Sequence, residues 1–139
     1  MTIDERDGPE SWPQDVLVAL EPPFADGRGA IQPLVDAKML SAVLITSKPG
    51  ALRGNHYHKT DWHYCYVVSG CIEYFFRPHG SSAPPERILV PAGSMAFTPP
   101  MVEHGMRFHE DTVFVTLGRN PRDQASYEAD VVRIDLIGP

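Results

Sequence analysis

The chain has 139 residues, 42% of them hydrophobic and 22% charged, with a formal net charge of −6. A chain of this size and composition can bury a core as one globular domain without disulfide staples. The acidic balance, without a cluster of Lys and Arg, excludes nucleic acid as the expected partner. The polar start, MTIDERDGPESWPQD, and the short apolar run at 16–20 argue against a signal peptide or membrane span.

Residues 1–15 show no hydrophobic periodicity and are predicted to form a flexible tail before a single domain at 16–139. The apolar run at 16–20 predicts a short strand. Prolines and glycines predict a loop at 21–29, and residues 30–36 are a candidate for another strand. Residues 39–47 predict a buried strand that ends at Pro49-Gly50.

Short strand signals recur through the rest of the chain, separated by turns rich in glycine and proline. They lie at 54–58, 62–68, 71–77, 86–90, 94–98, 104–109 and 112–117. Strands this short at this spacing predict an all-β fold, an antiparallel sandwich or barrel. The polar segment 122–130 predicts a short helix, followed by a final strand at 131–137.

Three histidines, His56, His58 and His63, stand within eight residues of a predicted strand region. Alternate residues of a strand share a face, so His56 and His58 point the same way and Tyr57 points the other way. A turn or bulge at 59–61 would return His63 to their face, followed by Cys65. Crowded imidazoles repel one another when protonated and compete for partners when neutral, and a divalent cation relieves both problems. The alternative is that each histidine is a surface residue or a satisfied core residue.

This region and a second segment, 93–108, resemble the two sequence motifs of the cupin superfamily. The first motif matches at Gly50, His56, His58, His63 and Gly70, with histidine in place of the usual glutamate at His63. The second motif matches at Gly93, Pro99 and His104, with Met101 in place of a glycine and Phe108 in place of an asparagine. The resemblance covers about residues 39–117.

The resemblance implies a double-stranded β-helix (jelly-roll) barrel, commonly a homodimer, with one divalent metal ion inside. His56, His58 and His104 fall on ligand positions, and His63 falls on the glutamate position. The expected ion is Zn, Fe, Ni, Mn or Cu, since imidazole suits several of these metals. Four neutral ligands would leave the ion its full charge, which favours acidic bound water and anionic substrates.

Two short segments resemble those of nucleotide-sugar 3,4-ketoisomerases and 3,5-epimerases within the cupins. They are the DGRG segment at 26–29 and the RGNHYHK segment at 53–59. The likeness implies an isomerase or epimerase of a nucleotide-linked keto sugar in surface-polysaccharide synthesis. His56 and His58 are then candidate bases if they hold no metal. Tyr66 is a further catalytic candidate, and the candidates for binding the substrate diphosphate are Arg53, Arg28 and Lys59.

Two other functions stay open: a dioxygenase that uses Fe(II) or another metal, and a non-catalytic small-molecule-binding cupin. The expected partners are a small-molecule substrate and a second copy of the chain, with no nucleic acid and no membrane. Cys65 and Cys71 lie too close together to close a useful loop, so free thiols and a cytoplasmic location are expected. His79 and His109 are expected to be exposed, and Glu103 to point away from His104.

Overall fold

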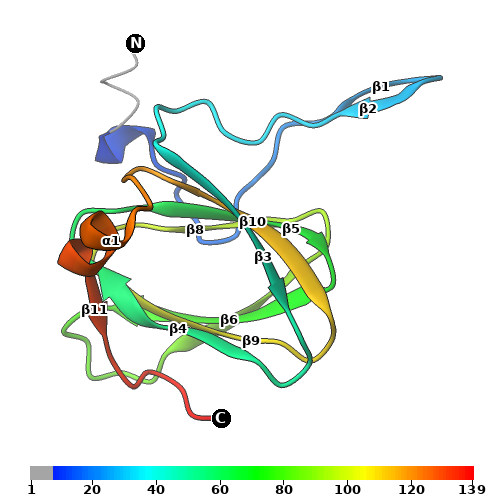
Figure 1. The fold of residues 1–139 in the computed structure, drawn as a ribbon. Coiled ribbons are helices and arrows are strands. Elements are labelled where there is room, and N and C mark those ends of the chain that lie inside the picture. The colour runs from blue at the N-terminus through cyan, green and yellow to red at the C-terminus, as the bar shows by residue number, and fades with distance from the viewer. Residues whose placement is uncertain (1–7) are drawn as a thin grey trace.

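A computed structural model describes residues 8–139, whose regular structure is almost entirely β (Figure 1). The strands of the barrel are β3 (Ser41–Ser47), β4 (Leu52–His58), β5 (His63–Ser69), β6 (Cys71–Pro78), β7 (Glu86–Pro91), β8 (Met95–Thr98), β9 (Val102–Arg107), β10 (Thr112–Gly118) and β11 (Val131–Arg133). They form two antiparallel sheets, ordered β3-β10-β5-β8 and β11-β4-β9-β6-β7.

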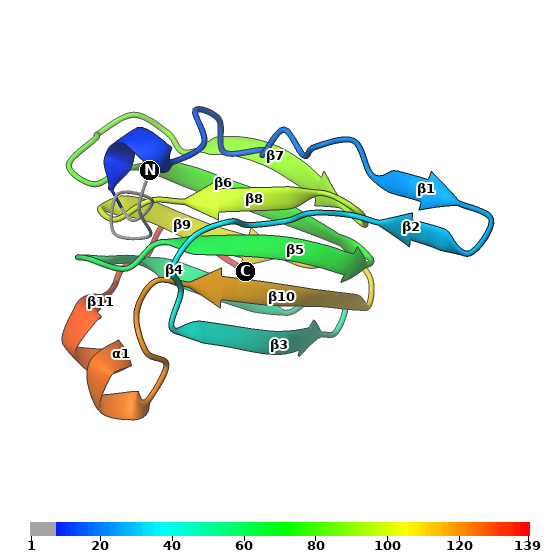
Figure 2. The same ribbon diagram turned by 90° about the horizontal axis from the view of Figure 1, so that it is seen from above.

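The two sheets face each other and form a double-stranded β-helix barrel, as the sequence predicts (Figures 1 and 2). A core of apolar side chains fills one end of the space between them. It includes Val67, Ile72, Tyr74 and Phe108, each fully buried. Phe108, which stands where the cupin motif has asparagine, packs on Phe114 with 5.7 Å between ring centroids. Burial of these large side chains supplies most of the favourable free energy of folding.

A second apolar cluster covers the outer face of β5 and β8, and the N-terminal segment contributes to it. Trp12 follows a short 3-10 turn at Pro9–Ser11, and its ring lies 5.9 Å from that of Phe97. Residues 8–15 therefore differ from the predicted flexible tail, whose residues 1–7 lie outside the described residues. The strand predicted at 16–20 is reduced to one bridge, between Leu17 and Ala96.

The segment predicted as a loop at 21–29 contains a strand, and a β-hairpin forms at its end. Strands β1 (Phe24–Asp26) and β2 (Gly29–Ile31) pair through a two-residue turn and project from the barrel (Figures 1 and 2). Directly after this turn, Gly29 has a φ of 136°, a conformation that glycine adopts without steric cost. The strand predicted at 30–36 ends at Ile31, and every residue of the hairpin is exposed.

The predicted helix is present as α1 (Gln124–Asp130), and it covers one end of the barrel (Figures 1 and 2). Asp123 caps it, because its carboxylate accepts a hydrogen bond from the Ser126 backbone N–H. The final strand is shorter than predicted and ends at Arg133. No helix within residues 8–139 is long and apolar enough to cross a bilayer.

Candidate active site

A β-bulge in β4 sets the direction of the first site histidine. The pairing of β4 with β9 shifts between Gly54 and His56, and Gly54 and Asn55 have φ of 78° and 55°. A Cβ atom on Gly54 would lie 2.9 Å from the carbonyl oxygen of His104, so only glycine fits there. Asn55 tolerates the left-handed conformation, and its side chain is fixed by hydrogen bonds to the backbone of Ile137. The bulge places His56 directly opposite His104.

Three of the four predicted ligands come together inside the barrel. One ring nitrogen each of His56, His58 and His104 lie within 4.8 Å of one another. The centroids of the His56 ring and the His58 ring are 4.9 Å apart, and those of His56 and His104 are 4.6 Å apart. The predicted shared face of His56 and His58 is thereby confirmed, and Tyr57 lies on the other face, stacked on His79.

The orientation of His58 is set by a buried carboxylate from the end of α1. Its Nδ1 lies 3.2 Å from Oδ2 of Asp130, and its ring is 3% exposed. Asp130 also accepts hydrogen bonds from the backbone N–H groups of Thr60 and Asp61 and from the Thr60 hydroxyl. With Nδ1–H donated to this carboxylate, the lone pair of His58 is on Nε2, which is buried without a hydrogen-bond partner.

His104 is oriented in the same way by the backbone. Its Nδ1 lies 3.1 Å from the carbonyl oxygen of Val102, so it donates there and the lone pair is on Nε2. Histidines that ligate metals commonly donate their second nitrogen to a carboxylate or a carbonyl. The partners of His58 and His104 therefore match those of metal-ligating histidines.

His63 returns to the face of His56 and His58, as predicted, but lies outside the group of three converging ring nitrogens. Its ring centroid is 4.8 Å from that of His58, yet its Nε2 lies 2.7 Å from Oδ2 of Asp61. Asp61 is 4% exposed, and its other oxygen accepts from the Asn120 backbone N–H. A buried carboxylate needs such partners. The group of three imidazoles forms without His63, whose Nε2 is engaged by Asp61, a residue of the predicted turn at 59–61.

Burial and mutual repulsion keep the three clustered histidines neutral. Burial is the largest cause, and neighbouring histidines add to it, so the pKa values fall from 6.5 to about 2 for His56, about 4 for His58 and about 3 for His104. Neutral imidazoles with converging ring nitrogens are a donor set that fits a divalent transition-metal ion.

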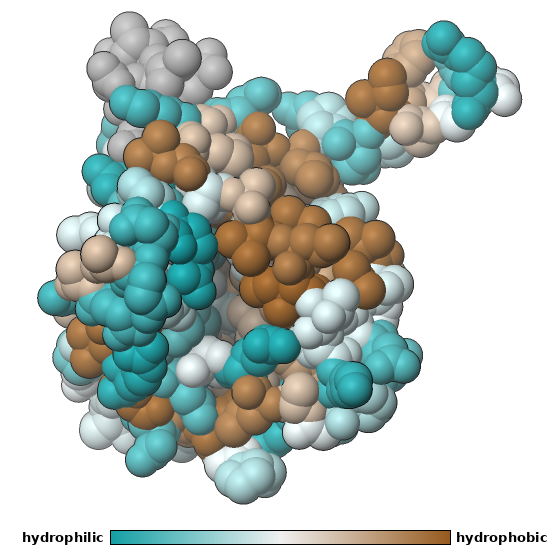
Figure 3. Space-filling model, viewed as in Figure 1, coloured by the Kyte–Doolittle hydropathy of each residue, from teal (hydrophilic) through white to brown (hydrophobic). Residues whose placement is uncertain are grey.

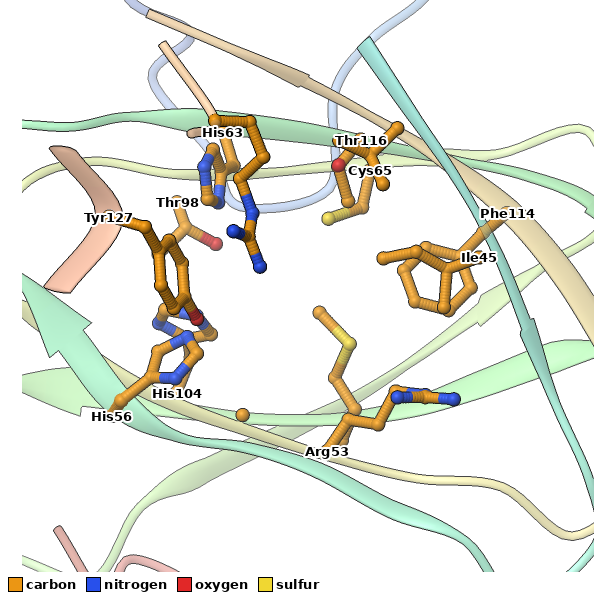
Figure 4. A pocket seen from close by; sticks show the side chains of 14 residues that line it. Ile45, Arg53, His56, His63, Cys65, Thr98, His104, Phe114, Thr116 and Tyr127 are labelled. Atoms are coloured by element: carbon orange, nitrogen blue, oxygen red, sulfur yellow. The ribbon is translucent and has the colours of Figure 1, made fainter. Parts of the chain in front are cut away.

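His56, His63 and His104 line a cavity of about 180 Å³ in the barrel. Figure 4 shows His56, His104 and Tyr127 gathered on one side, with Ile45 and Phe114 on the other. Figure 3 shows a hollow between a hydrophilic surface on the side of α1 and an apolar surface on the side of β3 and β10. The cavity thus has a polar half and an apolar half.

Two residues of the C-terminal segment line this cavity and were not predicted. The ring centroid of Tyr127 is 6.4 Å from that of His56 and 5.7 Å from that of His58, and burial raises the pKa of its phenol. The guanidinium carbon of Arg122 lies 3.6 Å from the centroid of the Tyr127 ring. The sequence signal for Tyr127 was its place in the predicted helix. Residues three apart lie on the same face of a helix, so Tyr127 shares the face of Asp130, which is buried.

Some predicted site residues lie away from the cavity. Tyr66 is on the opposite face of β5 from Cys65 and packs with the outer apolar cluster, so a catalytic role for Tyr66 in this cavity is wrong. Arg28 sits at the tip of the projecting hairpin, 87% exposed and paired with Asp26, and so does not reach the cavity of its own chain. Lys59 is exposed and is not among the described lining residues.

Other predictions agree with the structure. Arg53 lines the cavity, and its guanidinium donates to the Ser47 hydroxyl and the Thr46 carbonyl. Cys65 lines the cavity as a buried residue, and burial raises the pKa of its thiol to about 12. Both cysteines are free thiols.

The outer face of the barrel carries Glu103, His79 and His109. Glu103 points away from the cavity and pairs with Arg77 and His79. The side chains of His79 and His109 are 40% and 66% exposed.

Comparisons with known proteins were made by sequence and by structure. No protein-family model and no curated protein matches the sequence. Among solved structures, the chain is similar to a 3,4-ketoisomerase from Thermoanaerobacterium thermosaccharolyticum in complex with TDP, with a TM-score of 0.68, 22% identity, and coverage of 84% of this chain and 85% of that one. The chain shares this fold.

Two further structures extend the comparison. A dTDP-4-dehydrorhamnose 3,5-epimerase from Sulfolobus tokodaii has a TM-score of 0.67 and 18% identity, with 84% of this chain and 76% of that one covered. A 3,4-ketoisomerase from Helicobacter canadensis has a TM-score of 0.67 and 18% identity, with 81% and 85% covered. At these identities the likeness establishes the shared fold, and a fold alone does not determine the activity.

Proposed function

We propose that this protein is an isomerase or epimerase of a nucleotide-linked keto sugar. The observation that carries the proposal is the cavity in which imidazoles and the phenol of Tyr127 converge, within the fold of the sugar 3,4-ketoisomerases. One ketoisomerase structure of this fold was solved in complex with TDP-4-keto-6-deoxyglucose. Groups that accept and donate protons, facing one small cavity, are what proton transfer next to a ketone requires.

The size and polarity of the cavity favour a sugar ring as its occupant. Its volume of about 180 Å³ is below the roughly 300–1,000 Å³ of pockets that enclose a whole drug-sized ligand. The sugar would therefore enter the cavity while the nucleotide stays at its mouth. The apolar half, with Ile45 and Phe114, suits the methyl group of a 6-deoxy sugar, and the polar half would face the ketone.

A bound divalent cation is part of this proposal. His56, His58 and His104 would hold it, and the unpartnered Nε2 of His58 is the feature that most favours it. When bound, the ion would polarise the ketone oxygen. The cavity wall then keeps two groups for proton transfer, His63 and Tyr127.

His63 is the proposed base. Its Nε2 is held by buried Asp61, which stabilises the positive charge that the ring gains with a proton. The base takes a proton from the carbon next to the ketone, and the C–H electron pair forms the carbon–carbon double bond of an enediolate as the carbonyl electrons move to oxygen. Return of a proton to the other carbon, with transfer of the hydroxyl proton from one oxygen to the other, completes a ketoisomerisation. Return of the proton to the opposite face of the same carbon completes an epimerisation. Tyr127 is the proposed proton donor.

The function is tested with TDP-4-keto-6-deoxyglucose in deuterated water. We expect NMR to show deuterium entering the carbon next to the ketone without consumption of O₂, because the exchanged proton comes from solvent. An oxygenase would instead consume O₂ and lose activity on iron chelation. Absence of both exchange and binding across a panel of nucleotide-linked keto sugars would contradict the proposed function.

The metal is tested by elemental analysis of protein purified without chelator. We expect about one divalent ion per chain in the wild type, and loss of that ion in His58→Ala and His104→Ala, because each substitution removes a ligand nitrogen. The matched control is His109→Ala, which changes an exposed histidine on the outer surface and should retain the ion. A wild-type protein that contains no divalent ion would contradict the proposed metal site.

A further inference from the structure

The fixed charges on the cavity wall are all positive. Among the described residues that line the cavity, two carry a permanent charge, Arg53 and Arg122, and none is an aspartate or glutamate. Asp61 and Asp130 lie behind the histidines, and their oxygens are taken up by hydrogen bonds or by His63 and His58. A concave wall with this charge favours a negatively charged group inside it.

Arg53 and Arg122 differ in the contacts that their guanidinium groups already make within the protein. The guanidinium of Arg53 is held on β3 by its hydrogen bonds to Ser47 and Thr46. Arg122 makes no hydrogen bond or ion pair within residues 8–139, and its contact is the face of the Tyr127 ring. The nearby carboxylate of Glu128 is bound by both terminal nitrogens of Arg133, at 2.9 Å and 2.7 Å. The five N–H donors of Arg122 are therefore available to a ligand.

Stacking on Tyr127 gives Arg122 a defined position beside the proposed reaction centre. The cation lies over the ring face, a favourable geometry that limits where the guanidinium can go. Arg122 directly precedes Asp123, the residue that caps α1, so the same short segment positions the arginine and the tyrosine. The pair reaches the cavity from the end that α1 covers.

We propose that Arg122 forms an oxyanion site in this cavity and binds the enediolate oxygen that develops when the substrate is deprotonated. This inference rests on the proposed function and adds a catalytic residue to it. The planar guanidinium matches the two adjacent oxygens of an enediolate by donating two parallel hydrogen bonds. The stacked Tyr127 hydroxyl would then lie beside the same intermediate as proton donor.

The test compares Arg122→Gln and Arg122→Lys with a control, Lys48→Gln, which removes one positive charge at the exposed turn after β3. The first measurement is binding of inorganic phosphate by calorimetry, which needs no turnover. Arg122→Gln should weaken phosphate binding at least tenfold, Arg122→Lys should weaken it less, and Lys48→Gln should leave it within twofold. Equal phosphate affinity in wild type and Arg122→Gln, or no saturable binding by the wild type, would overturn the oxyanion site.

The second measurement is turnover of the nucleotide-linked sugar. Arg122→Gln should lower kcat by about 10²–10³-fold, as for loss of one oxyanion donor, with TDP affinity nearly unchanged. A loss of TDP affinity with kcat unchanged would overturn the enediolate role and place the diphosphate there instead. A wild type that is inactive on every sugar but binds phosphate through Arg122 would contradict the proposed function and leave the anion site standing.

Discussion

Asp130→Asn should lower turnover by about 10³-fold or more and release the proposed ion, although it replaces only one carboxylate oxygen by an NH₂ group behind the cavity wall. The Asp130 carboxylate accepts from both donors of Thr60, from the Asp61 N–H and from Nδ1 of His58. An asparagine has one acceptor oxygen, which the Thr60 donors would occupy. Its NH₂ group would then face His58 and force the proton onto Nε2, which removes the lone pair that faces the cluster.

The measurements for this variant are the deuterium exchange rate, the metal content and the midpoint of denaturant unfolding. Asp123→Asn is the matched control, because Asp123 is an exposed carboxylate on the same helix and bonds only the Ser126 backbone. It should cost at most about 1 kcal/mol of stability, the usual size of a capping effect, and leave the ion bound. If Asp130→Asn retains wild-type exchange and metal content, Asp130 does not orient His58.

The periodicity of the sequence was enough to predict the faces of the central strands. Strand parity placed His56 and His58 on one face and Tyr57 on the other, and the structure confirms each placement. This works because a strand alternates strictly, so the face of one residue fixes the face of its neighbours. The same alternation places Tyr66 on the face of β5 opposite Cys65, so it argued against a catalytic role for Tyr66 in the cavity.

One departure from the cupin motif, at Met101, falls where the backbone adopts a conformation that favours glycine. Met101 stands where the motif has glycine, and it keeps a left-handed φ of 64°. Its backbone N–H donates to the carbonyl of His58 at 2.7 Å, which joins the turn before β9 to the end of β4. The left-handed conformation costs a non-glycine residue about 1–2 kcal/mol of free energy. Spacing therefore predicted the turn correctly even though the residue type differs.

The polar partners of the site could not be predicted, because they come from far along the chain. Asp130 meets Thr60 across 70 positions, and Asn120 meets Asp61 across 59. The local sequence pattern does not indicate these long-range contacts, because they depend on where α1 packs against the barrel. The same docking brings Tyr127 of α1, and Arg122 just before the helix cap, to the wall of the cavity.

In the presence of chelator, the free energy of unfolding should fall steeply as the pH is lowered from 7 to 5. The pKa values of His56, His58 and His104 are lowered from 6.5 to about 2, 4 and 3, mainly by burial. Below pH 6.5, the unfolded chain binds three protons that the folded protein does not bind until the pH approaches 4. Stability is therefore complete above pH 6.5 and is lost toward pH 4, by up to about 1.4 kcal/mol per pH unit for each histidine.

Denaturant titrations at several pH values measure this slope. His56→Gln should reduce this slope by one proton, because glutamine does not titrate. A flat profile between pH 7 and pH 5 would mean that the histidines are as easily protonated in the barrel as in water. Adding the divalent ion should raise stability most at neutral pH, because protons and the ion compete for the same ring nitrogens.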